Sequence, residues 1–422
     1  MTRETIADQA DQVVIAGAGL AGLAAAATAA RAGARVLILD EKSPGGRART
    51  DEMDGFRFNR GPHAVYVAGA GRQVMNRLDV RPATHTPPLR GARVLVSGEL
   101  RPPLSRHVLG ARAAAQLTAV FTRISRTSRG DCPRVSTRDW LATMDLTPRA
   151  AAMLEFFVRV TSYVADLDAM PADLAIGQLR MGLRGVGYPD QGWQALVDGL
   201  RARATEAGAQ LRAHTPVTGI SGEPGAWKVR TLSGEEIPAA AVVVATGTPA
   251  GTRRLLPADP GWNGLGSEVT AACLDLGVRH TRTRLTFGID EPLYLSPHAP
   301  AGKLAPAGMG MVHVMRYGAS SADADRAQLE AFAAMAGITT GDVATSRFLP
   351  KMTVATALPA VGTGLAGRPP VAVEEMPGLF VAGDWAGPTG WLSDASLASG
   401  EQAGLLAARA VLPAPHALLP AA

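Results

Sequence analysis

The sequence predicts an α/β protein in which a parallel sheet covered by helices is interleaved with a second domain of α+β type. Two observations predict this fold class. A short apolar strand, a glycine-rich turn and an alanine-rich helix follow one another at residues 13–32, and a second apolar strand comes directly after them. Further short apolar strands lie far along the chain, at residues 239–246 and 379–382, so the pieces of the sheet are scattered along the sequence.

The first element has the pattern of a dinucleotide-binding unit. Val13 to Ile15 form an apolar run that fits a buried parallel strand, and the glycines that follow spell G-x-G-x-x-G at the start of a helix. Gly17 permits the tight turn, Gly19 lets the backbone approach a pyrophosphate, and Gly22 lets the helix lie close to the sheet. The N–H groups at the start of this helix then face the phosphates. The predicted phosphate-binding residues are Gly17, Ala18, Gly19, Leu20, Ala21 and Gly22.

The second strand supplies the acid that such a unit needs. Gly33 ends the helix, and residues 35–40 form a strand whose last residue is Asp40. Asp40 lies about 20 positions after the first glycine, the spacing at which a carboxylate binds a ribose hydroxyl. Glu41 is the second choice for this role. The second glycine turn, Gly45-Gly46-Arg47, and the late Gly383-Asp384 pair favour FAD over NAD as the dinucleotide.

The remaining elements follow from hydrophobic periodicity and turn residues. Residues 105–183 form a largely helical insert with many large apolar side chains. The other predicted elements are a strand and loop at 55–66, a hairpin at 93–100, a helix at 192–204, a strand at 209–220, a hairpin at 227–237, a buried strand at 239–246, strands with turns at 270–317, a helix at 323–336, a strand at 379–382, a helix at 393–411 and a frayed tail at 413–422.

Composition excludes several classes of protein. The 422 residues, 47% of them hydrophobic and 19% charged, suit a large globular enzyme. The net charge of +5 is not gathered in a basic run, so we expect no nucleic-acid partner, although weak peripheral contact with the inner face of a membrane stays compatible with this charge. Cys132 and Cys273 lack metal-ligand spacing, and we expect no metal. The polar N-terminus and the short apolar stretches predict a cytoplasmic protein.

These motifs together resemble the FAD-dependent amine oxidase and phytoene desaturase superfamily, and most closely its bacterial phytoene-desaturase-like branch. The matching stretches occur in family order over nearly the whole chain. They are GAGLAG with Asp40, PGGRART (44–50), GFRFNRGPHAVY (55–66), GVGYPDQGWQALVDGL (185–200), HTPVTGI (214–220), VVVATG (242–247) and LFVAGDWAGPTGWLSDASLASGEQA (379–403). The resemblance implies the two-domain GR2 flavoprotein fold with non-covalently bound FAD.

The resemblance also implies roles for individual residues. Gly46 and Arg47 would lie along the pyrophosphate and ribityl chain, and the backbone of Val217 would hold the adenine. Asp384 would bind the ribityl or pyrophosphate region, with Gly383 allowing the close approach. Ser393 and its neighbours would direct the N–H groups of the last helix at the flavin ring. Further residues at the implied cofactor site are Gly61, Pro62, Thr246, Gly247, Leu392 and Ala395.

For the reaction, the flavin itself carries the chemistry, so few catalytic side chains are expected. His63 follows the Gly61-Pro62 turn beside the flavin ring and is the candidate base, with a structural histidine as the alternative. Leu392 stands where amine oxidases of this superfamily place the second ring of their aromatic cage, which disfavours an amine substrate. Four aromatic residues are candidates for the wall of an apolar pocket, although core packing is the favoured interpretation for each: Tyr294, Tyr317, Trp385 and Trp391.

The predicted function is dehydrogenation of a hydrophobic or conjugated small molecule by hydride transfer to flavin N5. The alternatives are a flavin amine oxidase, a redox-neutral FAD-dependent isomerase and an escort-like binding protein without redox activity. Residues 8–92, 186–257 and 353–412 are predicted to build a discontinuous FAD domain. Residues 93–185 and 258–352 are predicted to build the substrate or lid domain.

Overall fold

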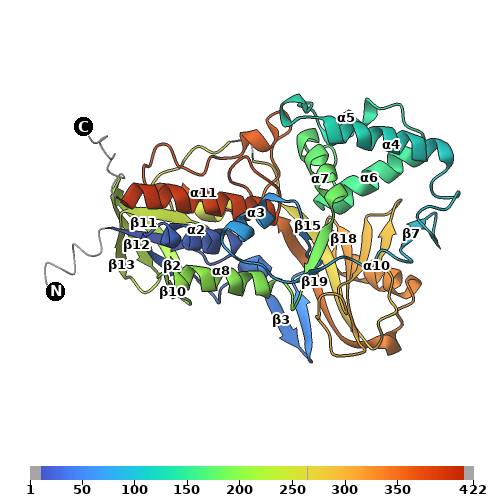
Figure 1. Cartoon of the computed structure of the whole chain (residues 1–422), viewed down its shortest axis with the longest axis horizontal. Coiled ribbons are helices and arrows are strands. Elements are labelled where there is room, and N and C mark those ends of the chain that lie inside the picture. The colour runs from blue at the N-terminus through green and yellow to red at the C-terminus, as the bar shows by residue number, and fades with distance from the viewer. Residues whose placement is uncertain (1–10, 264, 413–422) are drawn as a thin grey trace, which may run out of the picture.

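The computed structural model describes residues 11–263 and 265–412. The molecule has two lobes along its longest axis (Figure 1). One lobe holds the parallel sheet with helices packed along it, and the other holds a second sheet and a group of helices. The frayed tail predicted at residues 413–422, and the start of the predicted FAD domain at residues 8–10, lie outside the described residues.

The first lobe is built on a five-stranded parallel sheet, which confirms the predicted fold class. The order β10-β2-β1-β14-β20 places the first strand of the chain at the centre. Because the strands are parallel, their carboxyl ends meet at one edge, where ligands bind in such sheets. The strands are β1 (Gln12–Ala16), β2 (Arg35–Leu39), β10 (Gln210–Arg212), β14 (Ala241–Val244) and β20 (Leu379–Val381).

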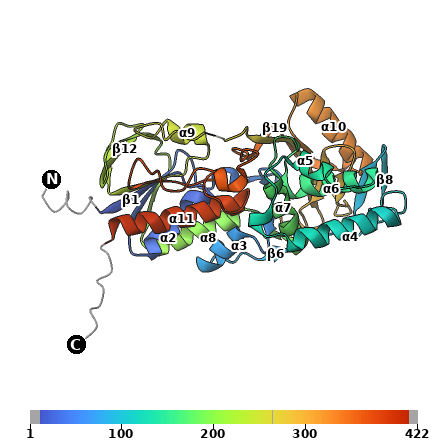
Figure 2. The same cartoon turned by 90° about the horizontal axis from the view of Figure 1, so that it is seen from above.

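Three long helices lie side by side along this sheet (Figure 2). The central one is α2 (Leu20–Arg31), which is buried along most of its length between α8 (Gln194–Glu206) and α11 (Ser393–Val411). Glycines make the contact between α11 and α2 close. A Cβ atom at Gly400 would lie 2.2 Å from the Ala21 carbonyl oxygen, and one at Gly404 would lie 2.4 Å from that of Ala25. The last helix of the chain is therefore packed directly onto the first.

Smaller antiparallel sheets surround the parallel one. The prediction of a single strand at residues 209–220 is wrong. The chain leaves the parallel sheet after Arg212, turns at His214 (φ 55°) and Pro216, and then pairs in a separate three-stranded sheet. These sheets comprise β11 (Val217–Glu223), β12 (Ala226–Thr231) and β13 (Glu236–Ala239); β3 (Thr50–Met53) and β4 (Phe56–Asn59); and β5 (Val65–Tyr66), β9 (Val186–Pro189) and β6 (Thr84–His85).

The second lobe is built on a seven-stranded sheet. Along β15, alternate side chains such as Leu274 and Leu276 pack against helix α10 (Ala322–Met335), and the other set faces away from that helix. Strand β19 was not predicted, because its residues are only half-buried and include Pro350. This strand continues across the predicted domain boundary between residues 352 and 353. In order, the strands are β19 (Val343–Ala355), β15 (Val269–Val278), β18 (Gly310–Tyr317), β17 (Leu293–Pro297), β16 (Thr286–Gly288), β7 (Arg93–Val96) and β8 (Glu99–Arg101).

The helical insert predicted at residues 105–183 is present and lies over the second lobe (Figure 1). In the described part of the chain, no helix is both long and apolar enough to cross a membrane. The insert contains α4 (Ala111–Arg126), α5 (Thr137–Ala142), α6 (Pro148–Ser162) and α7 (Ala172–Arg184). The remaining helical segments are α3 (Ala70–Arg77), α9 (Pro249–Arg253) and the short 3-10 turns Gly46–Ala48, Arg129–Asp131, Thr340–Asp342 and Gly364–Gly367.

Candidate functional site

One large cavity of about 1300 Å³ begins at the carboxyl edge of the parallel sheet and continues between the second sheet and the helical insert. Its wall is contributed by segments from nearly the whole chain. Most of the predicted cofactor-binding residues border it. These are Gly17, Gly19, Leu20, Ala21, Asp40, Glu41, Gly46, Arg47, Pro62, Val217, Thr246, Gly247, Gly383, Asp384, Leu392 and Ser393; Ala18, Gly22, Gly61 and Ala395 lie behind this wall.

The two glycine turns predicted from the sequence lie against each other. The Gly45 N–H donates to the Ala18 carbonyl at 2.8 Å, and Gly45 and Gly46 both have positive φ. A Cβ atom at Gly22 would lie 1.8 Å from the Gly17 carbonyl oxygen, so this glycine is needed for helix packing. In contrast, a Cβ at Gly19 would meet no protein atom within 4 Å. Gly19 thus leaves open backbone at the helix start, a cradle that fits a pyrophosphate.

Asp40 fixes the glycine turn at the end of β2. One carboxylate oxygen accepts the Ala18 N–H at 2.5 Å, and the other accepts the Lys42 N–H at 2.7 Å. The same carboxylate borders the cavity, as a ribose ligand must. Glu41 also borders it, but its side chain is exposed and pairs with Lys42. The contacts therefore favour Asp40 over Glu41 for this position.

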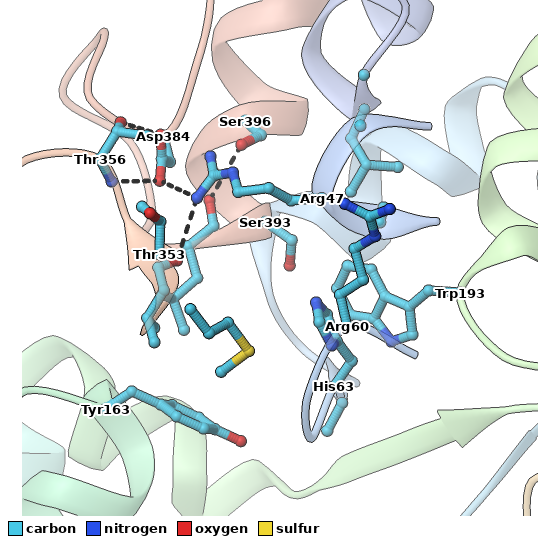
Figure 3. Close-up of a pocket in the computed structure, with 18 of the residues that line it drawn as sticks. Arg47, Arg60, His63, Tyr163, Trp193, Thr353, Thr356, Asp384, Ser393 and Ser396 are labelled. Atoms are coloured by element: carbon cyan, nitrogen blue, oxygen red, sulfur yellow. Dashed lines mark hydrogen bonds and ion pairs between the residues drawn. The ribbon is translucent and has the colours of Figure 1, made fainter. Parts of the chain in front are cut away.

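The early and late motifs are joined by an ion pair. Arg47 Nη1 lies 3.0 Å from Asp384 Oδ2, and Asp384 also accepts the N–H and the hydroxyl of Thr356 (Figure 3). Asp384 is 1% exposed, so its charge is compensated inside the protein. The sequence pointed to both residues but not to their pairing. The guanidinium of Arg47 is 41% exposed toward the cavity, which leaves its other N–H groups available to a phosphate or ribityl oxygen.

Sequence reasoning missed Arg368, which holds the loop after β20 from behind. Its Nη1 donates to the Asp384 carbonyl at 2.9 Å and its Nη2 donates to the Gly390 carbonyl at 3.0 Å. The side chain is buried. No motif marks this arginine, because it lies in an irregular segment and binds backbone atoms only through the tertiary fold. Its two contacts fix both ends of the loop that carries Asp384.

Helix α11 begins at the cavity with a strained residue. Leu392 has φ 54° and ψ −130°, a conformation that an L-residue with a branched side chain rarely adopts. Ser393 and Ser396 border the cavity, whereas Ala395 is fully buried behind them. Asp394 binds the start of α3 instead, because its carboxylate accepts the Gly71 N–H at 3.0 Å. Burial raises the pKa of Asp394 to about 6.

The part of the cavity beside β11 and β14 fits the adenosine end of a dinucleotide. Val217 is the first residue of β11 and borders the cavity with its neighbour Pro216. Thr246 and Gly247 follow β14 at the same edge, and Gly247 has φ 99°. Val217 therefore lies at the cavity, where its proposed backbone contact with an adenine can be tested.

His63 lies at the point where the cavity turns from the parallel sheet toward the second lobe. Its Nδ1 lies 2.8 Å from the Gly61 carbonyl, so Nδ1 carries the proton and Nε2 carries the lone pair. The ring packs edge-on against Trp193, with 4.8 Å between the ring centroids (Figure 3). Burial lowers the pKa of His63 to about 4. The imidazole is therefore neutral at pH 7 and borders the cavity as a hydrogen-bond acceptor.

The far end of the cavity is lined mainly by aromatic and aliphatic side chains. Tyrosine hydroxyls there are bonded to the protein: Tyr66 donates to the Thr161 carbonyl at 2.5 Å, Tyr163 donates to the Pro62 carbonyl at 3.2 Å, and Tyr188 bonds to Ser296 at 2.7 Å. Their rings are left to line the wall. The other apolar residues of this end are Phe121, Phe157, Val160, Leu179, Leu285, Phe287, Tyr294, Leu349, Met352 and Val354.

Of the four aromatic candidates from the sequence, only Tyr294 borders the cavity. Trp391 is buried and donates to the Ser162 carbonyl at 2.9 Å, so it fixes the end of α6. Trp385 is buried against Trp262 behind the parallel sheet, and Tyr317 lies beneath Tyr294 and Tyr163. Trp391, Trp385 and Tyr317 therefore pack in the core, the interpretation favoured for each of them, and do not line the cavity.

One family model matches most of the chain. Residues 12–389 match the family described as FAD dependent oxidoreductase. Among curated proteins, the chain is 29% identical over 289 residues to a phytoene dehydrogenase from Streptomyces griseus, covering 60% of this chain and 57% of that protein. It is 27% identical over 289 residues to a carotenoid 3,4-desaturase from Haloarcula japonica, covering 58% of each. The chain thus spans less than two thirds of the length of these relatives.

Solved structures show the same fold over nearly the whole chain. An oxidoreductase from Methanosarcina mazei superposes with a TM-score of 0.74 at 17% identity, covering 93% of this chain and 99% of that chain. Putrescine oxidase bound to putrescine superposes with a TM-score of 0.73 at 15% identity, covering 94% and 98%. At such low identity the likeness establishes the fold alone.

Proposed function

Since the chain belongs to the FAD-dependent oxidoreductase family, with FAD as its cofactor, we propose that it dehydrogenates an apolar or conjugated small molecule. The observation that carries the proposal is the aromatic far end of the cavity. Among the described residues that line the cavity, the acids are Asp40, Glu41 and Asp384, and all three belong to the cofactor end. A substrate at the other end meets ring faces and aliphatic groups, which favour apolar molecules.

In this proposal FAD is bound non-covalently, and different residues of the chain bind its different parts. The backbone at Gly19 and at Gly46 would cradle the pyrophosphate, and Asp40 would bind a ribose hydroxyl. Arg47 would face the phosphate and ribityl oxygens from its pair with Asp384. The start of α11, at Ser393, would direct N–H groups at the ring and stabilise negative charge on it. FAD supplies the acceptor for hydride, which no side chain can provide.

His63 is proposed as the side chain that meets the reacting end of the substrate. Its neutral Nε2 is an acceptor that borders the cavity, and the Gly61 carbonyl fixes its tautomer. When a hydrocarbon loses a hydride, an adjacent carbon must lose a proton for a double bond to form. A fixed imidazole lone pair can accept that proton. Tyr163, opposite His63 in Figure 3, would keep the substrate in place and exclude water.

The cavity is exposed to solvent beside two apolar side chains. Leu89 is 64% exposed and Leu183 is 55% exposed, and both line the cavity. We propose that the apolar substrate enters here, between α7 and the loop that carries Leu89. Exposed leucines at an entrance are suited to weak peripheral contact with a lipid surface, from which an insoluble substrate can be taken up.

Anaerobic bleaching of the flavin tests the proposed reaction. Purified holoenzyme is mixed without oxygen with a panel of carotenoid-type polyenes in detergent micelles and, separately, with primary and secondary amines including putrescine. We expect the flavin absorbance to fall with at least one polyene and with none of the amines. Bleaching by amines alone would replace the desaturase-type proposal by an amine oxidase. Conversion of a polyene to an isomer without net bleaching would indicate the redox-neutral reaction instead.

A further inference from the structure

A cluster of buried titratable side chains lies on the second sheet, outside the cavity wall. Asp275 is the central residue of three adjacent strands: it is paired in register with His313 on β18 and with Arg347 on β19. These side chains lie on the face of the sheet turned away from α10. Asp275 and His313 are completely buried, and nothing in the proposed cofactor site uses them.

The hydrogen bonds define the charge and the tautomer of this cluster. Arg347 donates from Nε and Nη2 to one oxygen of Asp275 at 3.0 and 2.6 Å. His313 Nδ1 lies 2.5 Å from the other oxygen. Burial alone would raise the pKa of Asp275, but His313 and Arg347 together hold this pKa below its ordinary value. Asp275 is therefore a carboxylate, and His313 Nδ1 donates to it, which leaves Nε2 as the ring nitrogen without a partner among the described residues.

The cluster also includes a buried thiol. Cys273 donates to the carboxylate of Asp275 at 3.2 Å, and burial raises the pKa of this thiol well above its ordinary value. The contact between Asp275 and His313 resembles the aspartate–histidine pair that orients a catalytic imidazole.

Two side chains, His298 and Tyr188, lie between His313 and the cavity. His313 Nε2 and both ring nitrogens of His298 have no hydrogen-bond partner among the described residues, although both side chains are buried. The two rings meet edge to face at 4.6 Å, and the ring of His298 stacks on Tyr188 at 3.8 Å. Tyr188 lines the cavity. Buried nitrogens of this kind are normally satisfied by ordered water, which also conducts protons.

We propose that the Asp275–His313 pair holds the proton that leaves the cavity when a substrate is dehydrogenated, with His63 as the first acceptor in the cavity and His298, which stacks on the cavity-lining Tyr188, next to the pair. This inference rests on the proposed function. One C–H bond gives its electron pair and hydrogen to FAD, the adjacent carbon gives up a proton as the double bond forms, and that proton is transferred to His313 Nε2. Asp275 then balances the imidazolium charge, as in a catalytic triad.

The surrounding charges suit this role. His63 borders the cavity, but burial lowers its pKa to about 4, so at neutral pH it passes a proton on instead of keeping it. Positive charge on His313 is among the causes that lower the pKa of both His63 and His298. The neighbouring Tyr188 and Tyr294 stay neutral, because burial raises the pKa of each. Arg347 bonds to one oxygen of Asp275 and also pairs with Asp51 at 3.0 Å, so the other oxygen of Asp275 faces His313.

The first arm of the test needs no substrate. In holoenzyme labelled with 15N-histidine, NMR should show His313 with its proton on Nδ1 while the flavin is oxidised. After reduction by dithionite at the same pH, both nitrogens should be protonated, because the equilibrium protonation state does not depend on the source of the electrons. In Asp275→Asn the oxidised enzyme should lose the Nδ1-H tautomer. A proton on Nε2 in the oxidised wild type, or no uptake on reduction, would overturn the proposal.

The second arm uses the polyene that bleaches the wild-type flavin fastest. His313→Gln, and separately His298→Phe, should slow flavin reduction about 10²-fold at neutral pH and alter its pH profile, while FAD content is unchanged. His280→Gln is the matched control, because His280 pairs with Asp342 at 3.6 Å elsewhere in the second lobe. An equal loss at every pH would indicate a purely structural role and overturn the inference. If no polyene reacts with the wild type, the proposed function fails, and the NMR arm still decides whether the pair holds a proton.

Discussion

At the scale of the residue, burial decides how His63 behaves. Its pKa of about 4 means that folding favours the neutral imidazole. The contribution of this lowered pKa to the free energy of unfolding is fully present above about pH 6.5 and is lost as the pH falls through about 4. Between pH 6 and 9 the lone pair is therefore always available, and the role of His63 in catalysis should not vary with pH in that range.

The first prediction concerns this side chain. His63→Ala should slow flavin reduction by the reactive polyene about 10²-fold, because a positioned proton acceptor is lost. FAD occupancy, measured from the ratio of flavin to protein absorbance, should change much less. His107→Ala is the control, since His107 is exposed and outside the cavity wall. An unchanged reduction rate would leave His63 as a structural residue bonded to Gly61.

The second prediction concerns Asp394, whose pKa is raised to about 6 by burial. Because the folded state binds this proton more tightly than the unfolded state, stability is lost as the pH rises from about 4 to 6. Asp394→Asn keeps an oxygen for the Gly71 N–H and carries no charge. From pH 4 to pH 7, the variant should gain up to about 3 kcal/mol in free energy of unfolding relative to the wild type. Urea unfolding measures this gain.

Two outcomes bear on the Asp394 prediction. The control variant is Asp323→Asn, which replaces an exposed carboxylate. Its free energy of unfolding relative to the wild type should show no such pH-dependent gain. A constant difference between Asp394→Asn and the wild type across this pH range would mean that Asp394 is charged at little cost, and that the start of α3 compensates it fully.

At the scale of the element, each glycine of the first turn meets a different neighbour. Gly22 lies against the Gly17 carbonyl, whereas Gly19 is open to the cavity. The motif therefore combines a folding requirement with a binding requirement. The same distinction holds for α11, where Gly400 and Gly404 allow contact with α2 and have no role at the cavity.

The third prediction separates these two requirements. Gly22→Ala should destabilise the protein by about 3 kcal/mol or more, because its Cβ would lie 1.8 Å from a carbonyl oxygen. Gly19→Ala should leave the melting temperature of the apoprotein nearly unchanged, since φ at this residue is −74° and the Cβ has room. It should nevertheless weaken FAD binding, measured by calorimetry. Tight FAD binding by Gly19→Ala would place the pyrophosphate elsewhere.

At the scale of the whole molecule, the cofactor lobe is assembled from both ends of the chain. Strand β20 completes the sheet next to β14, and α11 covers α2. The Arg47–Asp384 pair joins the two halves at the cavity. We therefore expect this lobe to fold only when the C-terminal segment is present, as a discontinuous FAD domain requires.

The fourth prediction follows from that assembly. A chain without residues 353–412 should be colourless and aggregation-prone. Loss of this segment exposes the edge of β14 and the apolar face of α2. A chain that ends at residue 412 is the control and should remain yellow. Far-UV circular dichroism and flavin absorbance measure the outcome. A folded, FAD-loaded fragment ending at residue 352 would contradict the discontinuous domain.

The sequence alone determined the α/β fold class, FAD as the cofactor and the family, because these depend on local patterns. Strand, glycine turn, helix and terminal acid occur within 13–40, and a turn at Gly45-Gly46 needs left-handed backbone that only glycine adopts at little cost. The late Gly383-Asp384 motif was visible in the same way. Each of these signals depends on neighbours close in sequence, so one chain is sufficient to identify it.

Only the tertiary structure decided which distant side chains meet. The pairing of Arg47 with Asp384, the support from Arg368, and the Asp275–His313–His298 cluster join residues far apart in the chain, and no spacing predicts them. Trp391 looked like a pocket aromatic because of its place beside Leu392, yet it turns to bind the end of α6. The physical reason is the same throughout. Hydrogen-bond partners and burial are set by how strands align across sheets, and that alignment is not encoded in local periodicity.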